Sequence, residues 1–463
     1  MGTDSHPRAF RNVVTVLLFI LGVLLVAAGI AASIALHEVG HLLPAKLFKV
    51  RVTQYMVGFG KTLYSRRKGE TEYGIKAIPL GGYVSMIGMY PPARDRDGGT
   101  GTVRRSSTGL FSQLAEDARS AAAEQLRPGD GNRVFYKLPV WKRIIIMLGG
   151  PFMNLVIGTV LVGVVLTGFG TAQPTATVSE VYKCVVPASQ QAQTGQTDCL
   201  PSDPVAPATA AGIRPGDRIV SFDGRKVTDW YELTHWIRDA AGQKTPIVLE
   251  RDGALVSTSI TPIRTERPVL DEDNRPVLDA AGEPLTEQAG FVGMGPATEL
   301  VPQPASAVLP AVRENLQGIT AVVLDLPQRL ADVAQAAFGS EPRDPDGPIS
   351  VVGVGRIAGE ISAMQEIPLQ ARLASLIGLV GSLNLALFVF NLIPLLPLDG
   401  GHVAGALWEG LRRRVARLFR RPDPGPVDIA KLLPLTYVVA VLLMGMGALL
   451  IYADIVKPVN IFG

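Results

Sequence analysis

Four long apolar stretches dominate the pattern of hydrophobic and polar positions along the 463-residue chain. They are Val13–Leu36, Ile144–Gly170, Leu373–Leu396 and Leu432–Ala453, and none contains Lys, Arg, Asp or Glu. At a rise of about 1.5 Å per residue, each is long enough to cross a hydrocarbon layer of about 30 Å as a helix. We therefore predict a polytopic α-helical membrane protein with four transmembrane helices.

The spans and the connections between them predict an order of segments along the chain. These are a first helix within 1–50, a β region with a polar insert in 51–143, a second helix at 144–170, a β-rich domain at 175–263, a linker with an amphipathic helix in 264–371, a third membrane segment at 372–402, a basic connection at 403–431, and a fourth helix with a tail in 432–463. Ala305–Phe338 carries charge on one helical face, which is typical of a helix on a membrane surface. Residues 94–132 are polar and rich in Ala, so we expect them to be disordered.

Lys and Arg near the span ends predict the orientation, because cytoplasmic connections carry an excess of both. Basic residues occur throughout the connection after the first span and again between Arg412 and Arg421, whereas none follows the second span until Lys183. We therefore place both basic connections in the cytoplasm, with residues 171–371 and both termini outside, in a multi-pass protein of the plasma membrane. We expect the 412–421 run to form a solvated helix in contact with lipid headgroups.

A cleaved signal peptide is the alternative explanation of Val13–Leu36, because Arg8 and Arg11 precede it and small residues end it at Ala31–Ser33. Those two arginines also oppose the orientation chosen above. Signal peptides have apolar cores of about 7–15 residues, however, and this stretch is much longer. We therefore favour a membrane span.

The overall composition limits the class of protein. Apolar residues make up 47% and charged residues 18% of the chain, whereas soluble domains carry about 25% charged residues. A fully soluble enzyme is therefore excluded. A net charge of +3, with no block that combines basic and aromatic residues, argues against a nucleic-acid partner. Two cysteines are too few for a disulfide scaffold or a Cys-ligated zinc ribbon.

Residues 175–263 alternate short β-like runs with turn signals. Ala211–Val227 places Pro-Gly-Asp before an apolar strand and Asp-Gly after it. A helix-periodic stretch follows at Trp230–Ala241, and a hairpin is predicted to turn at Asp252-Gly253. One helix against a small bent sheet makes a compact β-rich module.

Two cysteines, Cys184 and Cys199, flank a loop rich in Gln, Pro, Ser and Thr. Outside the cell, a disulfide between them would contribute about 3 kcal/mol by closing that loop. Two free thiols are the alternative, because sequence separation does not show the geometry.

The chemistry starts at the end of the first span, with His37-Glu38-Val39-Gly40-His41. Residues four apart share a helix face, so both imidazoles can reach one ion. This is the HExxH zinc signature, in which the intervening Glu38 takes a proton from metal-bound water. The structural alternative to a zinc site is a polar helix end at the membrane interface. Ionisable groups at membrane depth cost about 2–3 kcal/mol each and are usually functional, which favours the metal site.

Catalytic zinc takes three protein ligands and keeps one position for water, so a third ligand is required. The third span ends in a stretch where Pro394 and Pro397 interrupt the helix just before Asp399. Such irregular backbone at membrane depth is tolerated only around protein or a wet cavity. We favour Asp399 as the third ligand. His402 could also coordinate, and the structural alternative for Asp399 is an N-cap of the following helix.

Five patterns in this order resemble the bacterial, PDZ-bearing branch of the site-2 proteases, a family of intramembrane zinc metalloproteases. They are HEVGH after the first span, "IPLGGYVSMIGM" at Ile78–Met89, the PDZ-like "AGIRPGDRI" from Ala211, "GPISVVG" at Gly347–Gly353 and "NLIPLLPLDGGH" at Asn391–His402. The resemblance covers nearly the whole chain. It implies an extracytoplasmic, β-rich, PDZ-like domain at 175–263 and a membrane-associated β-hairpin in addition to the four transmembrane helices.

The resemblance also assigns roles to individual residues. It implies one Zn²⁺ held by His37, His41 and Asp399, with Glu38 as the base and Asn391 in contact with substrate or the developing oxyanion. A hairpin that holds unwound substrate is implied for segments containing Gly58, Gly60, Gly81, Gly82 and Tyr83. Two departures stand out: the prolines before the Asp are spread to Pro394 and Pro397, and Asn384 matches no family position, so it stays unassigned.

The activity implied by the resemblance is cleavage of transmembrane helices in regulated intramembrane proteolysis. Its substrates would be membrane-embedded, single-span regulators such as anti-sigma factors, already cut by a site-1 protease in stress signalling. The PDZ-like domain would exclude untrimmed substrates or bind an extended peptide at a sheet edge. A structural β module without a ligand is the alternative.

Two other functions compete with the protease. A catalytically idle scaffold that recruits partners through the PDZ-like domain has no need of HExxH and a distant Asp399. A small-solute transporter is disfavoured because the four spans show no internal repeat.

Overall fold

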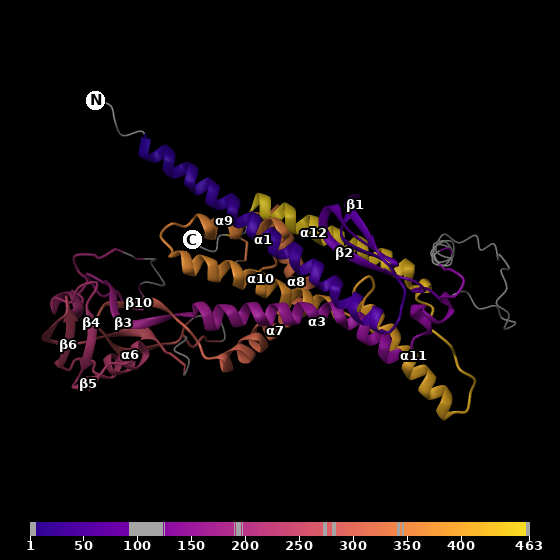
Figure 1. Cartoon of the computed structure of the whole chain (residues 1–463). Helices are drawn as coiled ribbons and strands as arrows, with labels where there is room; N and C mark the ends of the chain where they lie inside the picture. The colour runs from indigo at the N-terminus through magenta and orange to yellow at the C-terminus, as the bar shows by residue number, and fades with distance from the viewer. Residues whose placement is uncertain are drawn as a thin grey trace. The chain divides into compact units, whose positions relative to one another are not determined.

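The computed structural model describes residues 6–91, 124, 126–188, 190, 196, 198–271, 276–279, 284–339, 343–344 and 347–459 (Figure 1). The chain forms two compact units. Unit 1 comprises Met1–Phe169 and Pro304–Gly463, and unit 2 comprises Gly170–Gln303. The expectation of disorder for residues 94–132 concerns a segment that lies almost entirely outside the described residues.

Four helices of unit 1 are long and apolar enough to cross a membrane, which confirms the predicted spans. They are α1 (His6–Leu47), α3 (Val140–Val164), α10 (Leu369–Asn391) and α12 (Leu433–Val456). Helix α1 continues beyond the apolar stretch Val13–Leu36 through the HEVGH motif, which was placed on a first helix within 1–50. The apolar pattern resumes after that motif with Leu42 and Leu43, so the helix has no reason to end at the first polar residue.

The remaining helices of unit 1 are shorter. They are α7 (Val308–Leu324), α8 (Leu326–Phe338), α9 (Val351–Ala363) and α11 (Asp399–Leu418). The periodicity at 305–338 predicted a single helix, but the structure divides it at Asp325, just before Pro327. Helix α9 was not predicted. The hydroxyl of Ser350 starts it by accepting hydrogen bonds from Val352 N and Gly353 N.

Helix α1 packs against α3 and α9, and α10 packs against α3 (Figure 1). One buried cluster joins α1 to α9 and α10 through Val26, Ile357 and Leu376. Asn384, which was left without a role, is fully buried on α10 and donates to Ser33 Oγ of α1 at 2.9 Å. It therefore ties two spans together.

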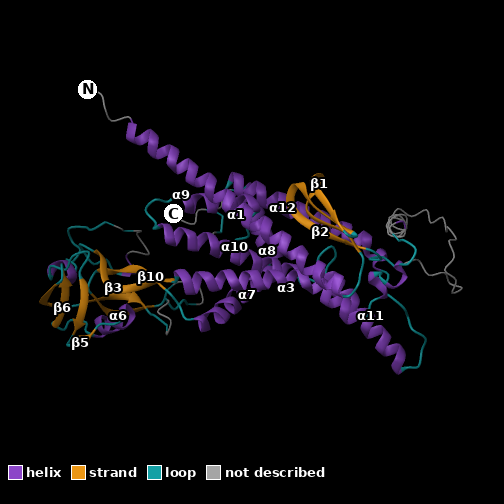
Figure 2. Ribbon diagram, viewed as in Figure 1, coloured by secondary structure: helices purple, strands orange, loops and turns teal. Residues whose placement is uncertain are grey.

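A long antiparallel hairpin follows α1 (Figure 2). It consists of β1 (Val52–Lys68) and β2 (Thr71–Met86). The Tyr55 hydroxyl of β1 donates to the Ala35 carbonyl of α1 at 2.7 Å, and Val52 and Met86 join a core with Leu42. These contacts fix the hairpin against the end of α1 that carries HEVGH.

Unit 2 is the β-rich part of the chain. Its strands are β3 (Thr171–Val181), β4 (Arg218–Phe222), β5 (Arg225–Lys226), β6 (Thr245–Arg251), β7 (Ala254–Ile260), β8 (Ile263–Pro268), β9 (Thr286–Phe291) and β10 (Met294–Val301). The main sheet has the order β10-β3-β4-β6-β7, with β5 beside β4, and β8 pairs with β9. Helices α5 (Pro207–Ala210) and α6 (Trp230–Asp239) complete the unit around buried Phe222, Leu233 and Leu249.

Two local predictions in unit 2 are matched by the structure. The β6–β7 hairpin turns at Asp252-Gly253, and α6 begins at Trp230, capped by Asp229. The β-rich domain was predicted to end at residue 263, but β8 begins there and unit 2 continues to Gln303. The segment assigned to a linker forms the β8–β9 hairpin and β10, because β10 pairs with β3 at the start of the unit. Cys184 and Cys199 form a disulfide.

Candidate metal and active site

His37 and His41 lie one turn apart on the same face of α1. Their Nε2 atoms are 3.2 Å from each other. The backbone break after α10 brings Asp399 to the same point, and its Oδ2 lies 3.4 Å from each of these two nitrogens. Among the described residues, these three form the group whose donor atoms lie close enough together to hold one metal ion.

The geometry of this triangle fits zinc. Ligand atoms about 2.0–2.1 Å from a tetrahedral zinc ion lie about 3.3 Å from one another. The three measured separations are 3.2, 3.4 and 3.4 Å. The buried Oδ2 of Asp399 has no hydrogen-bond partner in the described part of the chain. A buried charged oxygen without a partner is costly, so a cation between the three groups is the physical explanation of the arrangement.

The other ring nitrogens of both histidines are held from α3. His41 Nδ1 donates to the Ile146 carbonyl at 2.8 Å, which leaves Nε2 free to coordinate. His37 Nδ1 lies 3.1 Å from the amide of Asn154, which is 1% exposed. Turning that amide so that Oδ1 accepts from Nδ1 gives its otherwise unpartnered Oδ1 a partner and frees Nε2 of His37 as well.

Helix α3 reaches the site because glycine lies where the helices meet. A Cβ on Gly150 would stand 2.2 Å from His41 Nε2 and 2.7 Å from His37 Nε2. Any larger residue would therefore fill the metal position. Neither Gly150 nor Asn154 was singled out from the sequence, although "GGPFMN" places a proline and a polar asparagine inside an apolar span, which is an available signal.

Glu38 points toward the hairpin. It is 8% exposed, and a Cβ on Gly82 of β2 would meet its Cγ at 2.7 Å. The absence of a side chain at Gly82 thus lets the strand pass directly over Glu38. Glu38, Gly82 and the three candidate ligands all line one cavity of about 280 Å³.

Other predicted residues divide into those at the cavity and those away from it. Asn391, the last residue of α10, and Tyr83 of β2 line it. Gly58, Gly60 and Gly81 lie on the hairpin with positive φ but do not line the cavity.

The structure bears on both alternatives weighed for the break after α10. Leu398 occupies the N-cap position of α11, so the Asp399 carboxylate is not a cap. His402 lines the cavity without joining the three-residue group.

Helix α11 is fixed behind Asp399 by a buried ion pair. Fully buried Glu409 accepts from Arg143 of α3 at 2.5 Å and from the backbone N of Val427 at 2.9 Å. Arg413, one turn further along, contacts the same carboxylate at 3.0 Å. These contacts hold α11 against α3, and hence Asp399 against the two histidines.

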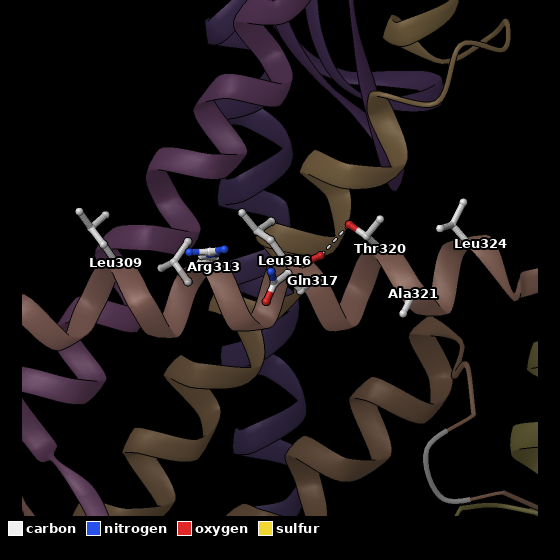
Figure 3. Close-up of a pocket in the computed structure, with 8 residues that line it drawn as sticks. Leu309, Arg313, Leu316, Gln317, Thr320, Ala321 and Leu324 are labelled. Atoms are coloured by element: carbon white, nitrogen blue, oxygen red, sulfur yellow. Dashed lines mark hydrogen bonds between the residues drawn. The ribbon is translucent and has the colours of Figure 1, made fainter.

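A larger cavity, of about 520 Å³, lies along α7 (Figure 3). Its lining consists of α7 side chains, among them Leu309, Leu316 and Leu324. Arg313 is the one ionisable residue among them. This groove therefore lacks the groups for acid–base or metal chemistry, and the smaller cavity is the candidate active site.

Comparisons with known proteins identify the class of enzyme. The model of peptidase family M50 matches residues 25–420. The zinc metalloprotease Rip1 of Mycobacterium tuberculosis is 33% identical over 449 residues, covering 96% of this chain and 100% of the relative. Rip1 of Mycolicibacterium smegmatis is also 33% identical with the same coverage, and the metalloprotease MmpA of Caulobacter vibrioides is 27% identical over 87% of each chain. The chain belongs to peptidase family M50 and is a zinc metalloprotease.

Proposed function

We propose that this protein is an intramembrane endopeptidase that binds one zinc ion and cleaves transmembrane helices of other proteins. The observation that carries the proposal is the single cavity onto which His37, Glu38, His41 and Asp399 converge from α1 and α11. Three of these would hold the metal and the fourth is free to act on water. A scaffold that only recruits partners would not require this arrangement.

The chain's own residues account for the chemistry of hydrolysis. When bound, zinc lowers the pKa of water and polarises a peptide carbonyl. Glu38 takes a proton from the attacking water and returns it to the leaving nitrogen, so the peptide bond breaks as one water is added. Asn391 lies at the same cavity, where its side-chain amide can donate to the oxygen that becomes negative.

The hairpin gives the substrate a place to unwind. A helical substrate hides its carbonyls in hydrogen bonds, so hydrolysis requires an extended segment. Strand β2 passes over Glu38 at Gly82 and carries Tyr83 at the cavity, and this position suits a strand that pairs with an extended substrate.

The substrate class follows from where this chemistry lies. Glu38 and both histidines belong to a 35-residue candidate membrane span, so the scissile bond would be reached from within or against the bilayer. Single-span regulatory proteins, such as anti-sigma factors already trimmed by a site-1 protease, fit such a site.

Unit 2 would control which substrates enter. In the described part of its sheet, β10 is an edge strand paired only with β3, so it offers backbone groups to an extended peptide. We favour a steric filter that excludes bulky external domains over recruitment of the trimmed end. Deletion of residues 176–262 with a flexible linker separates the two: a filter predicts cleavage of untrimmed substrate, and recruitment predicts poor cleavage of trimmed substrate.

The catalytic proposal is tested with the full chain in lipid nanodiscs and a fluorogenic transmembrane peptide. Glu38→Gln should abolish cleavage while bound zinc stays near one per chain, because the three ligands remain. His37→Ala should lose both cleavage and zinc. Hydrolysis of the peptide by a folded Glu38→Gln protein would exclude Glu38 as the base.

The orientation is a separate proposal: the basic connections face the cytoplasm, and unit 2 faces outward. An alkaline phosphatase reporter fused after Pro262 should be active, and the same reporter fused after Arg104 should be inactive. The reverse pattern would favour the signal-peptide interpretation of the first span.

A further inference from the structure

Helix α11 has two faces of opposite character. One face carries Asp399, Ala406 and Glu409 toward the rest of unit 1, and Ala406 and Glu409 are buried. The other face is apolar and exposed. It consists of Leu407, Trp408, Leu411, Val415, Leu418 and Phe419. Their three- and four-residue spacing places them in one stripe along the helix.

The same end of α11 carries cations without protein partners. Arg414, Arg417, Arg420 and Arg421 are exposed, and none makes a side-chain hydrogen bond or ion pair within the described ranges. Arg413 differs, because it pairs with Glu409. The end of α11 therefore combines an apolar stripe with four free positive charges.

The connectivity keeps this helix at the membrane. It lies between α10 and α12, which are both candidate spans, so the connection leaves and re-enters the same side of the bilayer. Gly410 of α11 lies against Val140, the first residue of α3. Trp141 and Trp408, one near each of these positions, are 54% and 56% exposed. Tryptophan is enriched at the level of the headgroups, so this pair marks the membrane interface.

We propose that the C-terminal half of α11, Leu407–Leu418 with Arg420 and Arg421, is a docking surface for the anionic lipids of the adjacent leaflet. Apolar side chains on the stripe enter the boundary between headgroups and acyl chains, and the free arginines bind lipid phosphates. Charge decides between occupants. A second copy of this helix would bring its own four arginines against these, whereas an anionic lipid surface neutralises them.

The test uses the full chain in nanodiscs of phosphatidylcholine mixed with phosphatidylglycerol, with one or the other lipid brominated. Bromine quenches nearby tryptophan, and the part of the signal lost in Trp408→Phe belongs to Trp408. At equal mole fraction, brominated phosphatidylglycerol should quench Trp408 at least about threefold more than brominated phosphatidylcholine, because each basic residue near the surface favours anionic lipid.

The combined variant Arg414→Gln, Arg417→Gln, Arg420→Gln and Arg421→Gln should equalise the two lipids. The matched control changes four exposed basic residues of unit 2, Lys183, Arg225, Lys226 and Lys244, to Gln and should keep the preference. The double variant Arg420→Gln, Arg421→Gln changes only residues beyond the end of α11. It should therefore weaken the preference for phosphatidylglycerol even if the fourfold variant does not fold.

Equal quenching by both lipids in the unaltered protein would overturn the proposal. So would protection of Trp408 from both lipids, which is the result expected if protein covers the stripe. The measurement involves no peptide hydrolysis, so its outcome is independent of the catalytic proposal.

Discussion

Two carboxylates in unit 1, Asp454 and Asp399, have opposite surroundings. Asp454 of α12 is 5% exposed, and both of its oxygens are used: Oδ1 pairs with Arg343, and Oδ2 accepts from Ser350 N at 2.7 Å and Gly353 N at 3.2 Å. Asp399 has a buried Oδ2 with no hydrogen-bond partner in the described chain, facing two imidazole nitrogens.

The difference separates a structural polar group from a candidate functional one. The Asp454 cluster is closed, because its charges cancel and its hydrogen bonds fix the start of α9. The Asp399 cluster is open, because its Oδ2 has no hydrogen-bond partner within the described residues and a cation would complete it. Burial and charge are common to both, so neither alone identifies a catalytic site at membrane depth.

The largest effect is expected from Asp399→Ala. Removal of one of the three proposed ligands should weaken zinc binding by more than about a hundredfold, beyond the loss expected for a residue that only orients a ligand. Cleavage should disappear with the metal. Because Oδ2 of this carboxylate has no hydrogen-bond partner within the described residues, the thermal midpoint of metal-free protein should change little. Zinc content after chelator dialysis checks this, and retention of one zinc per chain would exclude Asp399 as a ligand.

Asp454→Ala should do the reverse. Arg343 is 3% exposed at its side chain, and without its partner it becomes an uncompensated buried charge, which costs about 3–5 kcal/mol. The unfolding midpoint should fall while the folded fraction keeps its zinc. The double variant Asp454→Leu with Arg343→Met is the control and should recover much of the loss. Loss of zinc from folded Asp454→Ala protein would contradict the division into closed and open clusters.

Local sequence patterns predicted one of these clusters and not the other. Four charge-free apolar stretches define the spans, and the four-residue spacing of His37 and His41 places both on one helix face whatever surrounds them. Proline interruption before Asp399 indicated where the backbone opens. No local pattern joins Asp454 to Arg343, because Arg343 lies in the connection between α8 and α9 and meets Asp454 only through the packing of α12 against both helices.

The same reason explains what was missed elsewhere. Asn154 reaches His37 only because Gly40 and Gly149 let α1 and α3 approach closely: a Cβ on Gly40 would stand 2.2 Å from the Gly149 carbonyl oxygen. In unit 2 the β6–β7 hairpin was predictable from its Asp-Gly turn. The pairing of β10 with β3 was not, because it joins the two ends of the unit.

Asn154→Ala should have an intermediate effect. It removes the group that orients His37 without removing a ligand, and such losses lower metal affinity about 10–100-fold. Competition with a chromogenic chelator measures this directly. Asn384→Ala is the matched control, because Asn384 is an equally buried span asparagine that contacts Ser33 rather than a histidine. Equal zinc affinities in the two variants would show that Asn154 does not position the ligand.

The smallest effect concerns another buried carboxylate, Asp217, which lies in unit 2 rather than in unit 1. It is 1% exposed, accepts two hydrogen bonds from Arg251 and one from Arg214 N, and Arg251 holds its pKa below the ordinary value. Because the pKa is lower in the folded state, Asp217 stabilises unit 2 fully above its unfolded pKa of about 3.9, and this stabilisation is lost as the pH falls through the folded pKa.

Asp217→Asn should lower the free energy of unfolding at neutral pH by about 1–3 kcal/mol and flatten its dependence on acid pH. Denaturation of the full chain carrying Trp141→Phe and Trp408→Phe, followed by the fluorescence of the remaining Trp230 and Trp236, measures both effects. An unchanged acid dependence in Asp217→Asn would show that the ion pair of Asp217 with Arg251 makes no pH-dependent contribution to stability.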